Sequence, residues 1–335
     1  MLKKNRILAM IVVLAMCSML FTGCGSSKVA NAAADRLSVV CTIFPEYDWA
    51  KEIIGELGSN YELTLLMDDG TDLHNYQPTA QDIAKIAGCD VFVYVGGESD
   101  GWVEDALKEA TNRDMQVINL LEVLGTNVKE EELVEGMEAE HEEEESDESG
   151  DHEEDEIEYD EHVWLSLKNT RMIVSSMEQA LEKADSANAA VYQKNAEEYS
   201  KKLDELDKEY EEAVNSASKK TLLFGDRFPF RYLVDDYGLD YYAAFVGCSA
   251  ETEASFDTIT FLAGKVDELG LDKVLVIEKS DQKIARTIVE NTSAKNQEIL
   301  VLDSLQSVTS KDIENGESYL GIMQENLEVL KQAIQ

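Results

Sequence analysis

Apolar and polar positions follow two successive rounds of strand and helix patterns along this chain. In the first round, short apolar runs predict strands over residues 37–44, 61–66, 90–95 and 116–119. Helical patterns lie between them, at residues 48–57, 80–87 and 102–111. Strands that alternate with helices form parallel sheets covered on both faces, so this round predicts a first α/β lobe.

The second round repeats that plan in the last third of the chain. The predicted strands are 221–224, 241–245, 273–277 and 298–302, and the predicted helices are 232–237, 256–269, 283–292 and 318–334. We therefore expect a second small α/β lobe. A cleft between two such lobes is a common place for a ligand.

Two helical patterns separate the rounds, at residues 165–184 and 188–217. The second carries residues spaced alternately four and three: Tyr192, Ala196, Tyr199, Leu203, Leu206, Tyr210 and Ala213. Its thirty residues would span about 45 Å. A coiled-coil seam is the alternative, but a helix that ties two lobes together fits a run this short better. The predicted fold is α/β, with two sandwich lobes of parallel sheet joined by one long helix.

An acidic run interrupts the first lobe between residues 129 and 161. It holds twenty Asp or Glu, one Lys, and the histidines His141 and His152. The run therefore carries about half of the chain's formal net charge of −40. So few apolar residues predict a mobile, solvated loop. Its carboxylates and imidazoles favour weak capture of divalent cations, although such a run can also serve solubility alone. The strong acidity argues against a nucleic-acid partner, which would require clustered Lys and Arg.

The first residues read as an export signal. Lys3, Lys4 and Arg6 precede a short apolar stretch, and small residues then surround Cys24. We expect Cys24 to be the lipidated first residue of the mature protein; an ordinary secretory signal cut among residues 30–34 is the alternative. The predicted organisation is a lipoprotein signal peptide at 1–23, a linker at 24–35, an N-terminal lobe at 36–186 with the acidic loop 129–161, a linking helix at 187–218 and a C-terminal lobe at 219–335.

Three cysteines remain in the mature body, namely Cys41, Cys89 and Cys248. An odd number allows at most one disulfide, and the sequence does not choose the pair. None has the CxxC spacing of a thiolate zinc site. We therefore expect cysteine to take no part in the chemistry.

Polar residues at the ends of the predicted elements are the better candidates, since ligands of open α/β sheets bind outside the carboxyl ends of strands. His74 follows the second strand, Asp226 and Glu278 follow strands of the second lobe, and His162 precedes a helix. Two imidazoles and two carboxylates complete a four-coordinate shell for a divalent metal. Taken singly, Asp226 could be a helix cap and His74 a solvated loop residue.

Four motifs carry a resemblance to a known family. They are LHNYQPTAQDI at 73–83, YVGGESDGWV at 94–103, EHVWLS at 161–166 behind the acidic, His-containing insertion, and GxxYxxxMxxNL at 316–327. Together they resemble the solute-binding lipoproteins of zinc and manganese ABC transporters. That resemblance implies two lobes joined by one long helix, and one metal ion in the cleft.

The resemblance also implies a set of ligands and partners. The first two histidine ligands of the family fall on His74 and His162, and its acidic fourth ligand falls on Glu278. Asp226 is the nearest match to the third ligand, a His in zinc carriers and often a Glu in manganese carriers. We expect a monomer held by its lipid anchor on the extracytoplasmic face of the cell membrane, with an ABC transporter permease as partner.

The choice of metal turns on two conflicting features. A shell of two His and two carboxylates is typical of manganese carriers, whereas the acidic insertion is typical of zinc carriers. Because an N/O site holds Zn²⁺ more tightly than Mn²⁺, we expect zinc, with manganese as the alternative. An enzyme is not expected, since neither HExxH nor a Ser-His-Asp signature is present. A surface adhesin or cation-buffering lipoprotein is the alternative from another class.

Overall fold

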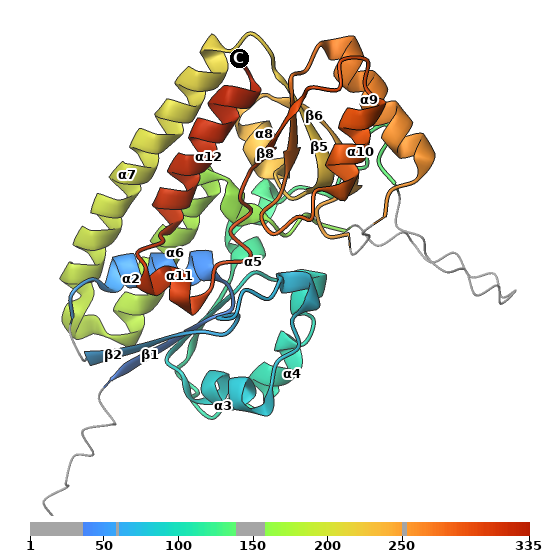
Figure 1. The fold of residues 1–335 in the computed structure, drawn as a ribbon. Helices are drawn as coiled ribbons and strands as arrows, with labels where there is room; N and C mark the ends of the chain where they lie inside the picture. Colours follow the sequence, from blue (N-terminus) through green and yellow to red (C-terminus); the bar gives the residue numbers. More distant parts are fainter. Residues whose placement is uncertain (1–35, 58–59, 139–157, 250–252) are drawn as a thin grey trace, which may run out of the picture. The chain divides into compact units, whose positions relative to one another are not determined.

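Two parallel sheets organise the part of the chain that the computed structural model describes, which is residues 36–57, 60–138, 158–249 and 253–335 (Figure 1). The first sheet has the order β2-β1-β3-β4. Its strands are β1 Leu37–Cys41, β2 Tyr61–Leu65, β3 Val91–Tyr94 and β4 Gln116–Asn119. The second sheet has the order β6-β5-β7-β8, with β5 Thr221–Phe228, β6 Asp240–Val246, β7 Lys273–Val276 and β8 Glu298–Val301. The predicted pair of parallel α/β sheets is confirmed.

Helices cover both sheets. In the first half of the chain they are α2 Phe44–Ile54, α3 Ala80–Gly88, α4 Val103–Lys108, α5 Leu120–Leu124 and α6 Leu167–Ala184. In the second half they are α8 Arg231–Tyr237, α9 Phe256–Leu269, α10 Lys283–Asn291, α11 Ser310–Glu314 and α12 Tyr319–Ala333. Within the described residues, none of the helices is both long enough and apolar enough to span a bilayer.

The predicted long helix is also confirmed, as α7 Ala189–Ser216. Its buried residues recur every three or four positions and form one apolar stripe: Tyr192, Ala196, Tyr199, Leu203, Leu206, Tyr210 and Val214. This stripe packs against α2, α6 and α12, and α12 runs alongside α7 in Figure 1. One continuous apolar cluster therefore includes residues of both sheets and of these four helices. The two lobes share a core.

The start of the fold differs from the prediction at Pro45. The strand pattern extended to residue 44, but β1 ends at Cys41 and α2 begins at Phe44, with the proline in its first turn. Proline is tolerated there because its missing N–H would have no partner within the helix. The Glu46 carboxylate accepts hydrogen bonds from the Thr42 and Ile43 amides at 2.9 and 3.3 Å and so caps the helix.

The first strand of the second sheet is longer than the sequence indicated. It was expected to end at residue 224, but β5 continues to Phe228 with a shift of register between Phe224 and Arg227. Gly225 lies so close to α10 that a Cβ there would meet the Cα of Ala285 at 2.6 Å. This contact holds the strand against the helix, and Asp226 consequently lies within β5 instead of after it.

The ends of the acidic run are part of the folded structure, so the prediction of a solvated loop over all of residues 129–161 is wrong at both ends. The Asp160 amide donates to the Lys129 carbonyl at 2.9 Å, and the Glu131 amide donates to the Glu158 carbonyl at 3.0 Å. Glu138 then forms a parallel bridge with Phe245 of β6. These two arms, residues 129–138 and 158–161, lie against the second lobe because backbone pairing there satisfies their polar groups.

We predict that a cavity in the shared core destabilises both lobes at once, because one apolar cluster joins them. Replacing Leu203, which is fully buried on α7, by Ala should lower the free energy of unfolding by about 2–5 kcal/mol. Urea unfolding followed by circular dichroism measures this change. The exposed Lys201 on the same helix provides the control, and Lys201→Ala should change stability by less than about 0.5 kcal/mol. Equal effects of the two substitutions would contradict the shared core.

Candidate metal site

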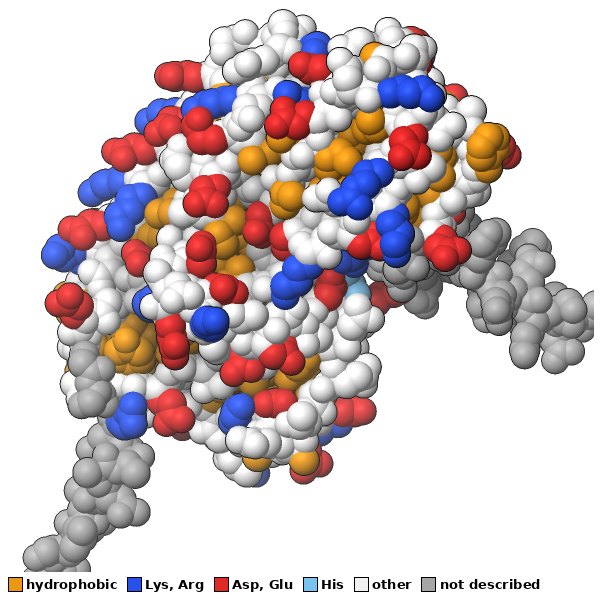
Figure 2. Space-filling view, in the orientation of Figure 1, with side chains coloured by type: hydrophobic (Ala, Val, Ile, Leu, Met, Phe, Trp, Pro, Cys, Tyr) orange, Lys and Arg blue, Asp and Glu red, His pale blue; other side chains and the backbone are white. Residues whose placement is uncertain are grey.

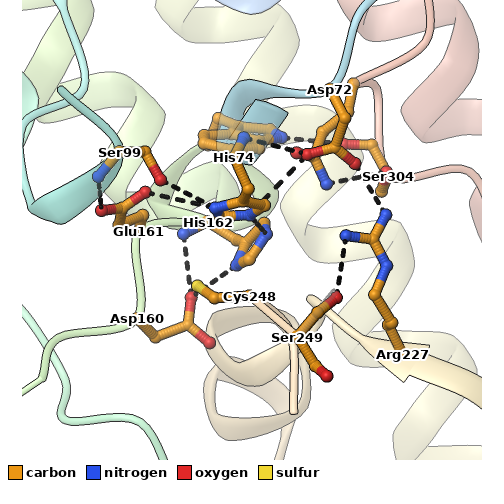
Figure 3. Close-up of polar contacts among 12 residues, drawn as sticks. Asp72, His74, Ser99, Asp160, Glu161, His162, Arg227, Cys248, Ser249 and Ser304 are labelled. Carbon is orange, nitrogen blue, oxygen red and sulfur yellow. Dashed lines mark hydrogen bonds and ion pairs between the residues drawn. The ribbon is translucent and has the colours of Figure 1, made fainter. Parts of the chain in front are cut away.

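His74 lies just past β2, in the short 3₁₀ turn Leu73–Asn75. Asp72 caps this turn by accepting a hydrogen bond from the His74 amide at 3.1 Å. The imidazole Nδ1 lies 2.8 Å from the hydroxyl of Ser99, which follows β3 (Figure 3). Ser99 can accept the Nδ1 proton, which leaves Nε2 with a free lone pair. Burial and the neighbouring His162 lower the pKa of His74, so its ring is neutral at physiological pH.

His162 precedes the 3₁₀ turn Val163–Leu165 and is fully buried. Its Nδ1 lies 3.0 Å from Asp160 Oδ1, and its backbone amide donates to the same oxygen at 2.8 Å. A carboxylate can only accept, so the proton of the neutral ring belongs on Nδ1. Burial lowers the pKa of His162, but the Asp160 carboxylate outweighs that effect, and the net pKa is raised.

The two imidazoles face each other through their remaining nitrogens. His74 Nε2 and His162 Nε2 are 3.2 Å apart, and the ring centroids are 5.1 Å apart. If both Nδ1 atoms carry the ring protons, the two Nε2 lone pairs face each other at a point where His162 is fully buried and the His74 side chain is 10% exposed. In that pair of tautomers the rings need a shared proton or a cation between them. In a tetrahedral shell with Zn–N distances of about 2.0–2.1 Å, two nitrogens lie about 3.3 Å apart.

Cys248 brings a third candidate ligand atom to this pair. Its sulfur and the nitrogens of His74 and His162 all lie within 4.8 Å of one another. Cys248 follows β6, and its amide donates to Glu131 Oε1 of the first arm at 3.2 Å. The sequence set the cysteines aside for lack of a CxxC motif, and that prediction missed this residue. The rule used for the other candidates would have found it, because Gly247 and Cys248 come directly after a strand.

Carboxylates surround the three groups. Glu161 accepts a hydrogen bond from the Ser99 amide at 2.9 Å, and its other oxygen lies 3.6 Å from His74 Nδ1. Burial raises the pKa values of Glu161 and Glu131. Burial first, and then these neighbouring acids, also raise the pKa of the Cys248 thiol. The surroundings are therefore rich in acidic groups that a bound cation would stabilise in their charged forms.

Asp226 and Glu278 lie together in an adjoining cleft of about 450 Å³ whose lining also includes Asp72 and Arg227. Asp226 Oδ1 accepts from the Arg227 amide at 2.9 Å, whereas its Oδ2 is buried and has no hydrogen-bond partner among the described residues. Glu278 follows β7, and its two oxygens accept from the amide and hydroxyl of Ser304 at 2.7 and 2.8 Å.

The four predicted ligands thus fall into two pairs. His74 and His162 meet at the imidazole pair, and Asp226 and Glu278 line the cleft. In Figure 2 a histidine is visible in a hollow of the surface, among Lys, Arg, Asp and Glu side chains. Neither carboxylate belongs to the three-residue cluster with Cys248, which is the candidate metal-ligand group found among the described residues. His141, His152, Cys24, the signal peptide and the linker lie outside the described residues.

None of Cys41, Cys89 and Cys248 forms a disulfide in the described part of the chain. Cys41 and Cys89 are fully buried, Cys41 in β1 and Cys89 beside α3. The disulfide that the cysteine count allowed is therefore not formed, and Cys248 is the thiol that lies beside the histidines.

Comparisons with known proteins relate this chain to zinc-uptake components. The high-affinity zinc uptake system protein ZnuA of Bacillus subtilis is 31% identical over 325 residues, which is 96% of both chains. The zinc-binding protein AdcA of Streptococcus pyogenes is 30% identical over 303 residues. That match covers 89% of this chain, and the chain spans about half of AdcA, 56% of its length.

A solved structure shows the same fold. The Zn(II)-bound ZnuA-like domain of Streptococcus pneumoniae AdcA superposes with a TM-score of 0.68 at 28% identity, and the match covers 89% of this chain and 99% of that domain. Residues 39–333 also match the family described as zinc-uptake complex component A, periplasmic. Since that match takes in both sheets and the connecting helix, the chain belongs to the ZnuA family of zinc-uptake components.

Proposed function

We propose that this protein captures Zn²⁺ outside the cytoplasm and delivers it to the permease of an ABC transporter. The observation that carries the proposal is the pair of imidazoles, one fully buried and one largely buried, whose Nε2 atoms face each other at 3.2 Å. Each ring is fixed through Nδ1 by a partner of its own, Ser99 or Asp160, as is usual for histidine ligands of metals. Membership of the ZnuA family supports a role in transport, not in catalysis.

Zinc is favoured over manganese by the relatives described above and by the site. The two relatives described above are named for zinc uptake and zinc binding, and the superposed domain holds Zn(II). Imidazole nitrogen suits zinc, and a given N/O site binds Zn²⁺ more tightly than Mn²⁺. Manganese remains the alternative cargo, and competition between the two ions distinguishes them.

The carboxylates Asp226 and Glu278 are proposed as the acidic part of the zinc shell. Their negative charges would balance a cation held by two neutral imidazoles. The buried, unpartnered Oδ2 of Asp226 supports a role in binding, since an ionised oxygen without a partner is costly. Glu278 is linked through Ser304 to Trp164, whose Nε1 donates to the Ser304 carbonyl at 2.8 Å and whose ring lies 5.2 Å from that of His162.

Lipid anchoring through Cys24, delivery to a permease and a monomeric state complete the proposal. The lipobox-like sequence before Cys24 supports the anchor, and the family's place in uptake complexes supports the permease. The adhesin and cation-buffer alternatives would place no demand on His74 and His162. The alignment of these two rings therefore favours transport over both.

We predict that zinc affinity depends on the imidazole pair and not on the other histidines. His74→Ala or His162→Ala should weaken zinc binding by more than the roughly 10–100-fold typical of losing an outer partner, because a ligand itself is removed. A competition titration with a chromogenic chelator measures the affinity. His141→Ala and His152→Ala are the matched controls and should leave the tight site unchanged. Equal losses at all four histidines would refute the assignment.

Asp160 should act on zinc through His162. In Asp160→Asn, the amide can present its NH₂ group to Nδ1 and favour the wrong ring tautomer, so zinc affinity should fall by about 10–100-fold. The same competition titration measures the loss, and circular dichroism checks the fold. Asp114→Asn, at an exposed position of the same lobe, is the control. An unchanged affinity in Asp160→Asn would show that the carboxylate does not orient the ligand.

The acidic insertion should collect zinc weakly without supplying the tight site. Replacing residues 139–157 by a neutral Gly/Ser linker of equal length keeps both arms, and it should leave one tight zinc per chain. The weaker binding should disappear, and in the wild type it should decrease with added salt, which screens exposed charge. Equilibrium dialysis at low and high zinc measures both classes. If the tight site is lost with the linker, the insertion supplies a ligand.

A further inference from the structure

We propose that Cys248 supplies the third protein ligand of the zinc ion, as a thiolate beside His74 and His162. This inference rests on the proposed zinc capture and deepens it by specifying the shell. It replaces Asp226 in the third position with a soft ligand that comes from the end of β6. In chemical terms, the S–H bond of Cys248 breaks, its proton leaves to solvent, and an Sγ–Zn bond forms without any change of oxidation state.

Position is the first argument. The sulfur lies within 4.8 Å of the imidazole nitrogens, and the two nitrogens are 3.2 Å apart. With Zn–S at about 2.3 Å and Zn–N at about 2.0–2.1 Å, a tetrahedral shell needs a sulfur-to-nitrogen distance of about 3.6 Å. A side-chain rotation that moves the sulfur by about 1 Å is therefore enough. Asp226 and Glu278 do not enter this cluster.

The backbone that carries Cys248 is held against His162, and this is an independent argument. A Cβ on Gly247 would meet the His162 ring carbon Cε1 at 2.9 Å and the Phe228 carbonyl oxygen at 3.0 Å. Only glycine allows the backbone to come so close to the ring. On the other side of this turn, the Cys248 amide donates to Glu131, and Arg227 donates to the Ser249 carbonyl at 3.4 Å. The thiol is thus brought to the histidines by fixed contacts on both sides.

A thiolate also explains how a shell with only two histidines can favour zinc. Soft sulfur ligands select Zn²⁺, whereas carboxylate and water suit Mn²⁺. One thiolate and one carboxylate neutralise a divalent ion, as two carboxylates would. Glu278 of the adjoining cleft keeps the carboxylate position of the proposed function, because it follows β7 whereas Asp226 lies inside β5. The shell then takes two ligands from each lobe.

Cobalt substitution tests the proposal on the full chain in detergent. After removal of zinc by chelator, Co²⁺ titration of the wild type should give an intense near-ultraviolet sulfur-to-cobalt charge-transfer band. Cys248→Ser should lack the band and bind zinc at least about tenfold more weakly, with a smaller loss for Mn²⁺, so that the zinc-to-manganese selectivity falls. Cys89→Ser, which alters a buried thiol of the first lobe, should keep the band.

A second variant distinguishes the loss of a zinc ligand from a failure of Cys248→Ser to fold. Cys248→His should restore tight zinc binding without the band, since imidazole can take the same position. A wild type that binds one zinc tightly but gives no band would overturn the role of Cys248 and leave zinc capture intact. A band that persists in Cys248→Ser would also overturn it. Failure of the wild type to bind zinc tightly would overturn the proposed function itself.

Discussion

The contact between His74 Nε2 and His162 Nε2 at 3.2 Å is the constraint on which the rest of the site depends. Two imidazoles stay this close only if the surrounding protein fixes both rings. Several hydrogen bonds do so on the His162 side. Asp160 holds the ring, the Tyr232 hydroxyl donates to the Asp160 carbonyl at 2.8 Å, and the Lys129 amide donates to that hydroxyl at 3.0 Å. Hydrogen bonds from both lobes therefore hold the His162 ring beside His74.

The shared core explains how residues from the two lobes are held at hydrogen-bonding distance from one another. Tyr319 at the start of α12 donates its hydroxyl proton to the Trp164 carbonyl at 2.6 Å, and its amide donates to Asp48 of α2 at 2.9 Å. Trp164, whose ring lies 5.2 Å from that of His162, in turn donates to Ser304 after β8. Tyr319 and Trp164 therefore connect α2, α12 and the segment after β8, and α7 packs against α2 and α12. This arrangement leaves less freedom between the lobes than a flexible hinge would.

Periodicity predicted most of the elements, because burial on one face leaves a clear trace in the sequence. Helix 256–269 and strand 116–119 coincide with α9 and β4. The prediction was wrong where a local sequence signal competed with tertiary structure. The strand predicted to end before Pro45 stops earlier, and the proline lies in the first turn of α2. The strand predicted to end at residue 224 continues through Gly225, where the lack of a Cβ allows it to pack on α10. Residues 129–138 were taken for solvated loop because acidic residues dominate them, yet Met137 is buried in the main core and backbone hydrogen bonds pair the segment with residues 158–160.

The candidate site shows the same division. His74 and His162 were chosen because they stand beside strand and helix ends, and the structure brings them together. Asp226 was chosen on the assumption that its strand had ended, and it lies inside β5 instead. Cys248 was passed over because the search required a pair of cysteines with short spacing. A thiol that lies beside histidines from distant segments leaves no such spacing, but its position directly after β6 is a signal that the sequence does carry.

The ion pair between Arg227 and Asp72 bears on how a bound cation would be released. Arg227 Nη2 lies 2.6 Å from Asp72 Oδ2 (Figure 3). Arg227 belongs to β5 of the second lobe, and Asp72 caps the turn that carries His74 in the first lobe, so this ion pair joins the two lobes. Both side chains are largely buried, so loss of either partner would leave the other charge uncompensated in a poorly solvated place. A cation held by groups of both lobes stabilises the arrangement in which they meet, and the reverse also holds. Anything that separates Arg227 from Asp72 would therefore weaken metal binding without touching a ligand.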